Sequence, residues 1–236
     1  MEVANRIVAE ILEGVKEKIR PGVKTRELDE LAEESCRRHG VQPAFKGYRG
    51  YPRSICVSVN EEVVHGIPGE RLLKAGDVVS LDFGVKHNGY YGDAAITVPV
   101  GEVTPQARLL LKATEESLYA GIGQFKVGGR LTDISHAVQT VVESYGFGVI
   151  REFVGHGIGR SLHEDPQIPN FGPPGRGPVL QAGMTLAFEP MTCAGAWQIR
   201  ILGDGWTAVT QDGSLAAHFE HTVALTESGA LILSRL

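Results

Sequence analysis

The chain has 236 residues, of which 42% are apolar, with 23 Lys and Arg against 28 Asp and Glu and a net charge of −5. This length suffices for one large domain or two small ones with a sizeable buried core. The acidic balance argues against a nucleic-acid or membrane-surface partner held by bulk electrostatics.

The first residues, Met1 to Arg6, lack the basic segment and long apolar core of a signal peptide, and no apolar run approaches the length of a membrane span. We therefore expect a cytoplasmic protein that does not associate with membranes. Cys36, Cys56 and Cys193 are widely spaced and form no C-x-x-C pair. The sequence thus predicts neither a disulfide framework nor a thiolate zinc site, and we expect reduced, mostly buried thiols.

Two helices are expected at the beginning of the chain. Apolar residues recur at helical spacing from Val3 to Ile19, which predicts an amphipathic helix that ends before a Pro-Gly pair. A second helix is expected to take Thr25 as its N-cap and to end at Gly40.

Strands follow these helices. Alternation over residues 54–59 predicts a strand, and residues 60–68, which include His65, predict a loop. The stretch 76–101 contains two runs rich in Val, Ile and Tyr on either side of an Asn-Gly pair at 88–89, a pattern typical of a β-hairpin.

Two acids of this hairpin, Asp82 and Asp93, are expected to share one face. A two-residue loop places Asp82 opposite Ala95 with Asp93 on the diagonal, whereas a four-residue loop places the two acids directly opposite each other. Because like charges on one face destabilise a sheet, the pair favours a metal site over ordinary solvated acids flanking a turn.

The order of helix, glycine turn, helix and strands then recurs. Thr104 is expected to cap a helix that runs to about Gly121, and Thr132 another that stops near Gly146. The segment LKAG at 73–76 matches LQAG at 180–183, an offset of 107 residues.

This repeat places acids in equivalent positions. At the offset of 107, Asp82 aligns with Glu189. Asp93 has its counterpart in Glu220, because in both segments an acid precedes an apolar run. The chain is therefore expected to be a single domain of two halves, about 1–103 and 104–236. A pseudo-twofold packing of the halves would bring all four carboxylates to one central site.

Four buried carboxylates carry a charge of −4, which two divalent cations balance. His156 lies between two glycines and is expected to supply an imidazole to the same site. A donor set rich in oxygen with one nitrogen suits Mn, Fe, Co or Zn ions. Two such ions activate a bridging water, so the sequence predicts metal-assisted hydrolysis.

These residues lie in a series of motifs that resembles the type I methionine aminopeptidases. The motifs, VHGIP, YYGDAAITVPVG, VGHGIGRSLHEDPQIPNFG, LAFEP and DGSLAAHFEHTVAL, extend over almost the whole chain. The resemblance implies the α+β pita-bread fold, with antiparallel strands backed by helices around a dinuclear metal site. It also implies removal of the N-terminal methionine from nascent polypeptides, favouring a small second residue.

The resemblance further implies a role for each residue of the site. Asp93 and Glu220 bridge two metal ions, Asp82 binds one ion, and His156 and Glu189 bind the other. Glu189 also acts as the proton shuttle.

The substrate-binding residues follow from the same resemblance. His163 contacts the scissile amide, and His65 assists at the amine or leaving nitrogen. This sequence has Phe45 where many relatives have Cys and Leu162 where many have Phe, which affects the shape of the pocket. The methionine pocket maps onto Tyr48, Tyr51, Cys56 and Trp206.

The other histidines are expected to be structural or on the surface; they are His39, His87, His136, His218 and His221. The expected partners are the N-termini of nascent polypeptides near the ribosome, and a monomer without stable nucleic-acid binding is expected.

Three alternatives share parts of this pattern. Proline dipeptidases and aminopeptidase P have the same metal ligands but usually an N-terminal domain, whereas this chain begins at the catalytic one. Type II methionine aminopeptidases insert a helical subdomain between His156 and Glu189, where this chain has only 32 residues. A binding module that has lost the chemistry is disfavoured because all five ligands and both further histidines are present.

Overall fold

The computed structural model describes residues 1–235, and its helices lie where the sequence predicts them. The helices are α1 (Glu2–Lys16), α2 (Thr25–His39), α3 (Pro105–Gly123) and α4 (Leu131–Ser144), with a short 3-10 helix η1 (Tyr48–Gly50). The first helix ends at Lys16, before the expected Ile19. In the described part of the chain, none of the helices combines the length and apolar character that crossing a bilayer requires.

The strands form one large sheet and two small ones. The large sheet has the order β1-β4-β5-β14-β9-β7-β8, with β2 also paired to β4 and β15 to β14. The small sheets are β13-β10-β6 and β11-β12-β3. The strands are β1 (Gln42–Pro43), β2 (Cys56–Val59), β3 (Glu62–Val64), β4 (Val78–His87), β5 (Tyr90–Pro99), β6 (Gly148–Val149), β7 (Gly155–Gly157), β8 (Glu164–Ile168), β9 (Thr185–Phe188), β10 (Met191–Cys193), β11 (Ile199–Ile201), β12 (Ala208–Thr210), β13 (Ala216–His218), β14 (Glu220–Thr226) and β15 (Gly229–Ile232).

The β4–β5 hairpin has the two-residue loop. Asn88 and Gly89 both have positive φ angles, 49° and 82°, as the tight hairpin turn requires. Asp82 consequently pairs with Ala95, and Asp93 lies on the diagonal. The first of the two registers that the sequence allowed is therefore correct.

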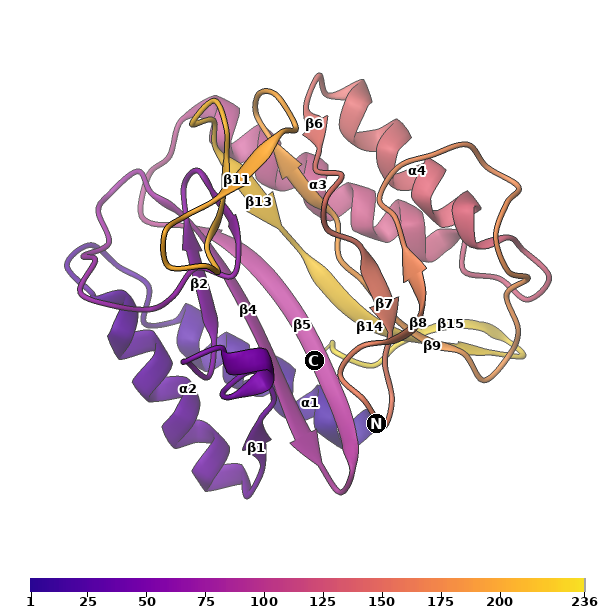
Figure 1. The fold of residues 1–236 in the computed structure, drawn as a ribbon, viewed down its shortest axis with the longest axis horizontal. Helices are drawn as coiled ribbons and strands as arrows, with labels where there is room; N and C mark the ends of the chain where they lie inside the picture. The colour runs from indigo at the N-terminus through magenta and orange to yellow at the C-terminus, as the bar shows by residue number, and fades with distance from the viewer. Residues whose placement is uncertain (236) are drawn as a thin grey trace.

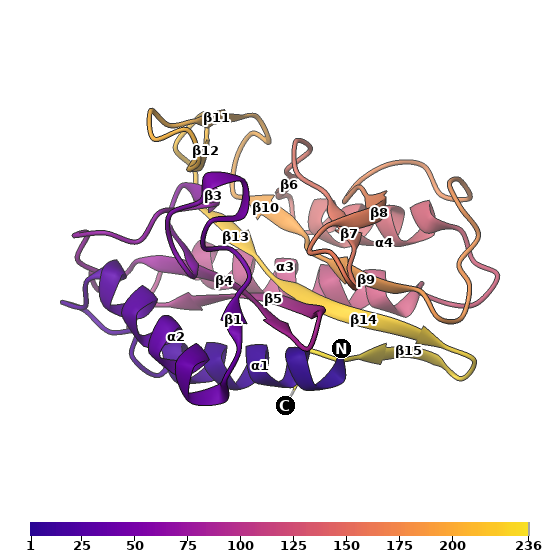
Figure 2. The ribbon, with the colours of Figure 1, turned by 60° about the horizontal axis from the view of Figure 1, so that its bottom comes forward.

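Helices cover one side of the large sheet, two from each half of the chain. Helices α1 and α2 lie against the β4–β5 end, and α3 and α4 lie against the end that contains β9 and β8, as Figures 1 and 2 show. The largest apolar cluster lies between α1, α2 and the β4–β5 hairpin, and further clusters lie beneath α3 and α4. The three cysteines are free thiols, and all are buried.

Three local predictions are wrong. Neither Thr25 nor Thr132 caps its helix, because the N-caps are Lys24 and Arg130. The 60–68 segment, expected to be a loop, contains strand β3, which pairs with β12.

The two threonines instead tie each helix to a later loop. The Thr25 hydroxyl donates to the Gly69 carbonyl (3.2 Å) and accepts from the Gly69 amide (2.9 Å). The Thr132 hydroxyl makes the same two bonds to Arg176, at 3.2 and 2.8 Å. Thr132 lies 107 positions after Thr25, and Arg176 lies 107 positions after Gly69. The two contacts therefore follow the offset of the sequence repeat.

Candidate metal centre

Three neighbouring strands place acidic residues in a row across the sheet. Asp82 on β4 pairs with Ala95 on β5, and Ala95 pairs with Glu220 on β14. Asp93 lies two residues before Ala95 and therefore on the same face. Because alanine is small, the space between these carboxylates stays open.

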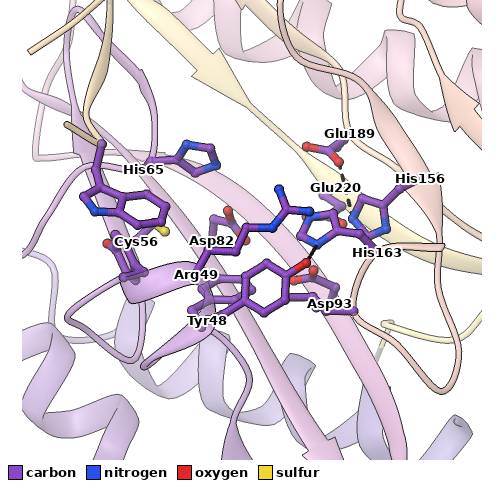
Figure 3. Close-up of a pocket in the computed structure, with 14 residues that line it drawn as sticks. Tyr48, Arg49, Cys56, His65, Asp82, Asp93, His156, His163, Glu189 and Glu220 are labelled. Carbon is purple, nitrogen blue, oxygen red and sulfur yellow. Dashed lines mark hydrogen bonds and ion pairs between the residues drawn. The ribbon is translucent and has the colours of Figure 1, made fainter.

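The second half of the chain completes the cluster. Glu189 follows strand β9, which pairs with β14, and His156 on β7 pairs with Ala187 of β9. One potential ligand atom from each of Asp93, His156 and Glu220 lies within 4.8 Å of the other two. Figure 3 shows these side chains gathered around one space.

Glycines provide the room for this packing. A Cβ atom at Gly84, which pairs with Asp93, would lie 3.1 Å from the Asp93 Oδ1 atom. Cβ atoms at Gly155 and Gly157 would lie 2.5 and 2.3 Å from backbone oxygens of neighbouring strands. The glycines beside His156 therefore allow the close backbone approach that the sequence predicted.

Burial controls the charge of the cluster. Within residues 1–235, one oxygen each of Asp82, Asp93 and Glu220 has no hydrogen-bond partner. Burial raises the pKa of Asp82 and that of Glu189 to about 7, and those of Asp93 and Glu220 well above their usual range. Buried carboxylate oxygens without donors are costly, so the cluster fits a bound cation.

The orientation of His156 supports this fit. Its Nδ1 atom lies 2.9 Å from the Gly157 carbonyl oxygen, which can only accept, so Nδ1 carries the proton. In the neutral ring, Nε2 then presents a lone pair, and it lies 3.5 Å from Glu189 Oε1. Two acceptors that face each other require a cation between them, and a carbonyl bond to the opposite nitrogen is common for histidines that bind metals.

All the site residues predicted from the sequence line one cavity, whose volume is about 150 Å³. Arg49 also lines it, and this residue was missed; its φ angle is 49°. Phe45 and Leu162, the two departures from the family pattern, lie in the same wall. The residues that surround the cavity are Phe45, Tyr48, Arg49, Tyr51, Cys56, His65, Asp82, Asp93, His156, Leu162, His163, Glu189, Trp206 and Glu220.

Aromatic and sulfur-containing side chains form the apolar part of the cavity. Tyr51 and Trp206 meet edge to face at 5.2 Å. Cys56 pairs with Asp82 across β2 and β4, so the apolar wall borders the carboxylates directly. Such a surface suits an unbranched, polarisable side chain.

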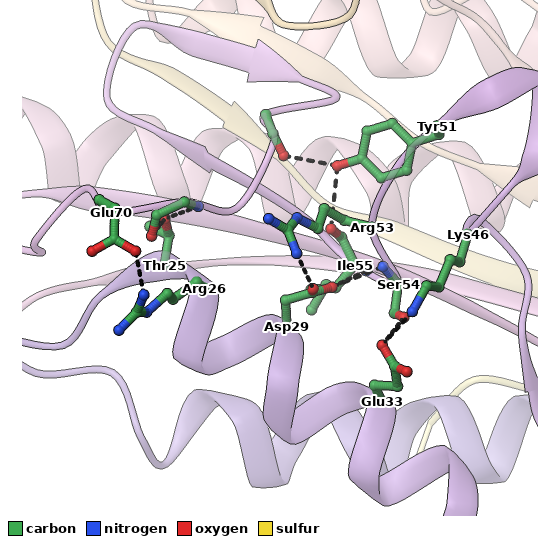
Figure 4. Close-up of polar contacts among 12 residues, drawn as sticks. Thr25, Arg26, Asp29, Glu33, Lys46, Tyr51, Arg53, Ser54, Ile55 and Glu70 are labelled. Carbon is green, nitrogen blue, oxygen red and sulfur yellow. Dashed lines mark hydrogen bonds and ion pairs between the residues drawn. The ribbon is translucent and has the colours of Figure 1, made fainter.

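Helix α2 holds this wall in place (Figure 4). Asp29 Oδ1 accepts hydrogen bonds from the Ser54 and Ile55 amides at 2.7 and 3.3 Å. The Tyr51 hydroxyl donates toward the Ile55 and Gly66 carbonyls, at 3.2 and 2.9 Å. The tyrosine thereby connects the pocket wall to the loop that bears His65.

Two histidines extend from the edge of the cavity toward the acids. His163 Nδ1 lies 2.9 Å from the Tyr48 hydroxyl, and the His163 ring is 4.3 Å from that of His156. His65 meets Trp206 edge to face. Burial lowers the pKa of His65 and that of His163 to about 4, so both rings are neutral near pH 7.

One further histidine, expected to be structural or on the surface, lies beside the acids. His218 is 1% exposed, and its Nε2 atom lies 3.6 Å from Glu189 Oε2. Its only signal in the sequence was its position two residues before Glu220. By contrast, His221 is bonded to Tyr119 and Ser234, a structural setting as expected.

The family follows from comparison with known proteins. Residues 1–227 match the model of metallopeptidase family M24. The chain belongs to this family. It is 56% identical to methionine aminopeptidase 1 of Bacillus subtilis, over 100% of this chain and 95% of the relative. Its identity to the methionine aminopeptidase of Clostridium perfringens is 53%, over 99% and 94%.

Solved structures of other peptidases have the same fold. The methionine aminopeptidase of Thermotoga maritima superimposes with a TM-score of 0.99 at 52% identity, over 100% of this chain and 95% of that one. The prolidase of Pyrococcus furiosus has a TM-score of 0.81 at 23% identity, over 100% and 63%, and at this identity it shows the fold alone. The pita-bread fold implied by the motifs is confirmed, and M24 membership implies that this chain uses divalent metal.

Proposed function

We propose that this chain is a methionine aminopeptidase that removes the N-terminal methionine from nascent polypeptides in the cytoplasm, with preference for a small second residue. The cluster of carboxylates around His156, next to an apolar pocket, is the observation that carries the proposal. The chain acts as a single catalytic domain made of the halves 1–103 and 104–236.

The cluster would hold two divalent cations. Asp93 and Glu220 lie centrally in the row of acids and would be ligands of both cations, and Asp82 on one side would be a ligand of the first. His156 and Glu189, whose facing atoms are 3.5 Å apart, share the second cation. When bound, two such cations supply an acidified water and polarise the scissile carbonyl.

Side chains of the protein carry out the proton transfers and bind the substrate amide. Glu189 takes the proton of the attacking water and passes it to the leaving nitrogen, acting first as general base and then as general acid. His163 and His65 are neutral and donate to the amide and to the amine or leaving nitrogen.

The substrate side chain enters the apolar end of the cavity. Methionine inserts between Tyr48, Tyr51, Cys56 and Trp206, and burial of each methylene-sized group contributes about 0.8 kcal/mol. Replacing methionine by alanine in the substrate therefore costs about 2–3 kcal/mol, or roughly 30–200-fold in kcat/KM. Measuring kcat/KM for peptides that differ only in the first residue checks this; equal rates for Met, Ala and Lys contradict the pocket but not the metal chemistry.

The proline peptidases are the second candidate, because they have the same fold. The decisive experiment loads the purified protein with Mn²⁺ and offers a Met-Gly-x peptide beside an x-Pro dipeptide. Cleavage of the Met-Gly-x peptide is expected. Cleavage of the x-Pro dipeptide alone would overturn the proposal.

A further inference from the structure

His218 is a buried histidine beside the site. The proposed function gives it no role. Within residues 1–235, neither of its ring nitrogens has a hydrogen-bond partner. A buried polar group without a partner is costly and rare, so such a group in a native protein requires an explanation.

The backbone of this residue is fixed from two directions. The Thr97 hydroxyl donates to the His218 carbonyl at 2.6 Å and lies 2.9 Å from the His218 amide, which donates to it. His218 also pairs with Met191, two residues after Glu189, across β13 and β10. These contacts fix the backbone of His218 beside the segment that bears Glu189.

Two imidazoles flank the Glu189 carboxylate. Oε1 lies 3.5 Å from His156 Nε2, and Oε2 lies 3.6 Å from His218 Nε2. The second distance is slightly longer than a hydrogen bond, and such bonds at active sites commonly tighten when the substrate binds. The backbone oxygen of Glu189 is held separately, by Asn170 Nδ2 at 3.0 Å.

We propose that His218 is a positioning residue for Glu189. When substrate binds, its Nε2–H group closes to a hydrogen bond with Oε2 and thereby keeps Oε1 turned toward His156 and the reacting centre. The inference rests on the proposed function, because it takes Glu189 as the proton carrier. His218 lies behind Glu189, is 1% exposed and acts through that carboxylate without touching substrate.

Two substitutions distinguish the effect of the N–H donor from the effect of the volume of the ring. His218→Gln keeps an N–H donor, whereas His218→Leu keeps an apolar volume and removes the donor. Loss of such an outer partner typically costs 10–100-fold, so we expect kcat of the Leu variant to fall by about that factor. We expect KM to stay within about twofold, and the Gln variant to retain kcat within about threefold.

His221→Leu is the matched control, since it removes a partly buried imidazole of β14 that contacts Tyr119 and Ser234 and not Glu189. We expect this variant to keep kcat within about threefold. Thermal unfolding of all variants shows whether they fold.

A second readout does not depend on turnover. Calorimetric titration with Mn²⁺ should show weaker binding for the Leu variant than for the Gln variant, by about tenfold. Equal kcat and equal Mn²⁺ affinity in the folded Leu and Gln variants would overturn the inference. If the wild type fails to cleave the Met-Gly-x peptide, the proposed function fails, and the Mn²⁺ titration still decides the role of His218.

Discussion

The two halves of the chain share a backbone framework but place different side chains at the central site. In each half a threonine of the second helix exchanges two hydrogen bonds with the backbone 44 positions later, Thr25 with Gly69 and Thr132 with Arg176. In each half an acid of the first helical turn also accepts from the N-cap amide. The repeated part of the molecule is thus a set of backbone connections that positions strands.

The halves differ in how they reach the central site. The first half presents two aspartates from the middle of a hairpin whose strands, β4 and β5, have 10 residues each. The second presents two glutamates from the ends of strands: Glu189 follows the 4-residue β9, and Glu220 begins β14. The longer side chains come from strand ends and the shorter ones from strand interiors, and the second half also adds His156.

The largest effect is expected from one acid of each half. Asp93→Ala and Glu220→Ala should both abolish turnover and lower metal content, because each residue is proposed to bridge two cations. Turnover of a Met-Gly-x peptide and metal analysis of the purified variants measure this. Near-normal turnover in either variant with both metals retained would contradict a dinuclear site built equally by both halves.

A smaller effect is expected from the histidines at the edge of the cavity. His163→Ala should retain metal and lose about 10²–10³-fold in kcat, the usual scale for one transition-state donor. His65→Ala, from the other half, should likewise retain metal. If metal content also fell in the His163 variant, this side chain would have to be reassigned as a ligand.

The sequence predicted the parts of the site that depend on local pattern. The Asn-Gly pair specifies a hairpin. The spacing of the repeat identified Glu189 as the counterpart of Asp82, and an acid before an apolar run identified Glu220 as the counterpart of Asp93. Whether the hairpin loop has two residues or four was left open, because both place the acids on one face.

The parts that were missed depend on pairing between distant segments. His218 meets Glu189 because β13 lies beside β10, and strand β3 exists because β12 pairs with it. No periodicity in the sequence encodes those contacts. Thr25 has the residue type of an N-cap, but its hydroxyl bonds a loop that is close only after folding.

Metal binding should depend on pH in the same direction for both halves. Burial raises the pKa of Asp82 and that of Glu189 to about 7, so in the metal-free protein the protonated carboxyls stabilise the fold at low pH, and this stabilisation is lost as pH rises through about 7. A cation must displace those protons. Mn²⁺ affinity should therefore tighten by at least about tenfold per pH unit between pH 5.5 and 7.

Calorimetric titration at several pH values measures this dependence. A Mn²⁺ affinity independent of pH between pH 5.5 and 7 would show that the carboxyls are already ionised without metal.

The neutral rings of His65 and His163 act in the opposite direction on the stability of the fold. Because burial lowers their pKa to about 4, stability is lost as pH falls from about 6.5 toward 4. This loss is expected in the metal-free protein as well.

The smallest effect tests the repeated framework itself. Thr25→Val and Thr132→Val keep the shape of the side chain and remove a hydroxyl that makes two backbone hydrogen bonds. Thr25 is 3% exposed, so loss of its hydroxyl leaves the Gly69 amide without its acceptor, while the Gly69 carbonyl still accepts from the Arg26 amide. The free energy of unfolding should fall by about 1–3 kcal/mol. Thr132 is partly exposed, and water can replace its hydroxyl, so its loss should cost less than about 1 kcal/mol. Urea unfolding of the two variants gives both values. Equal losses would show that the two connections are equivalent in energy as well as in geometry, and a larger loss at Thr132 would contradict burial as the cause of the difference.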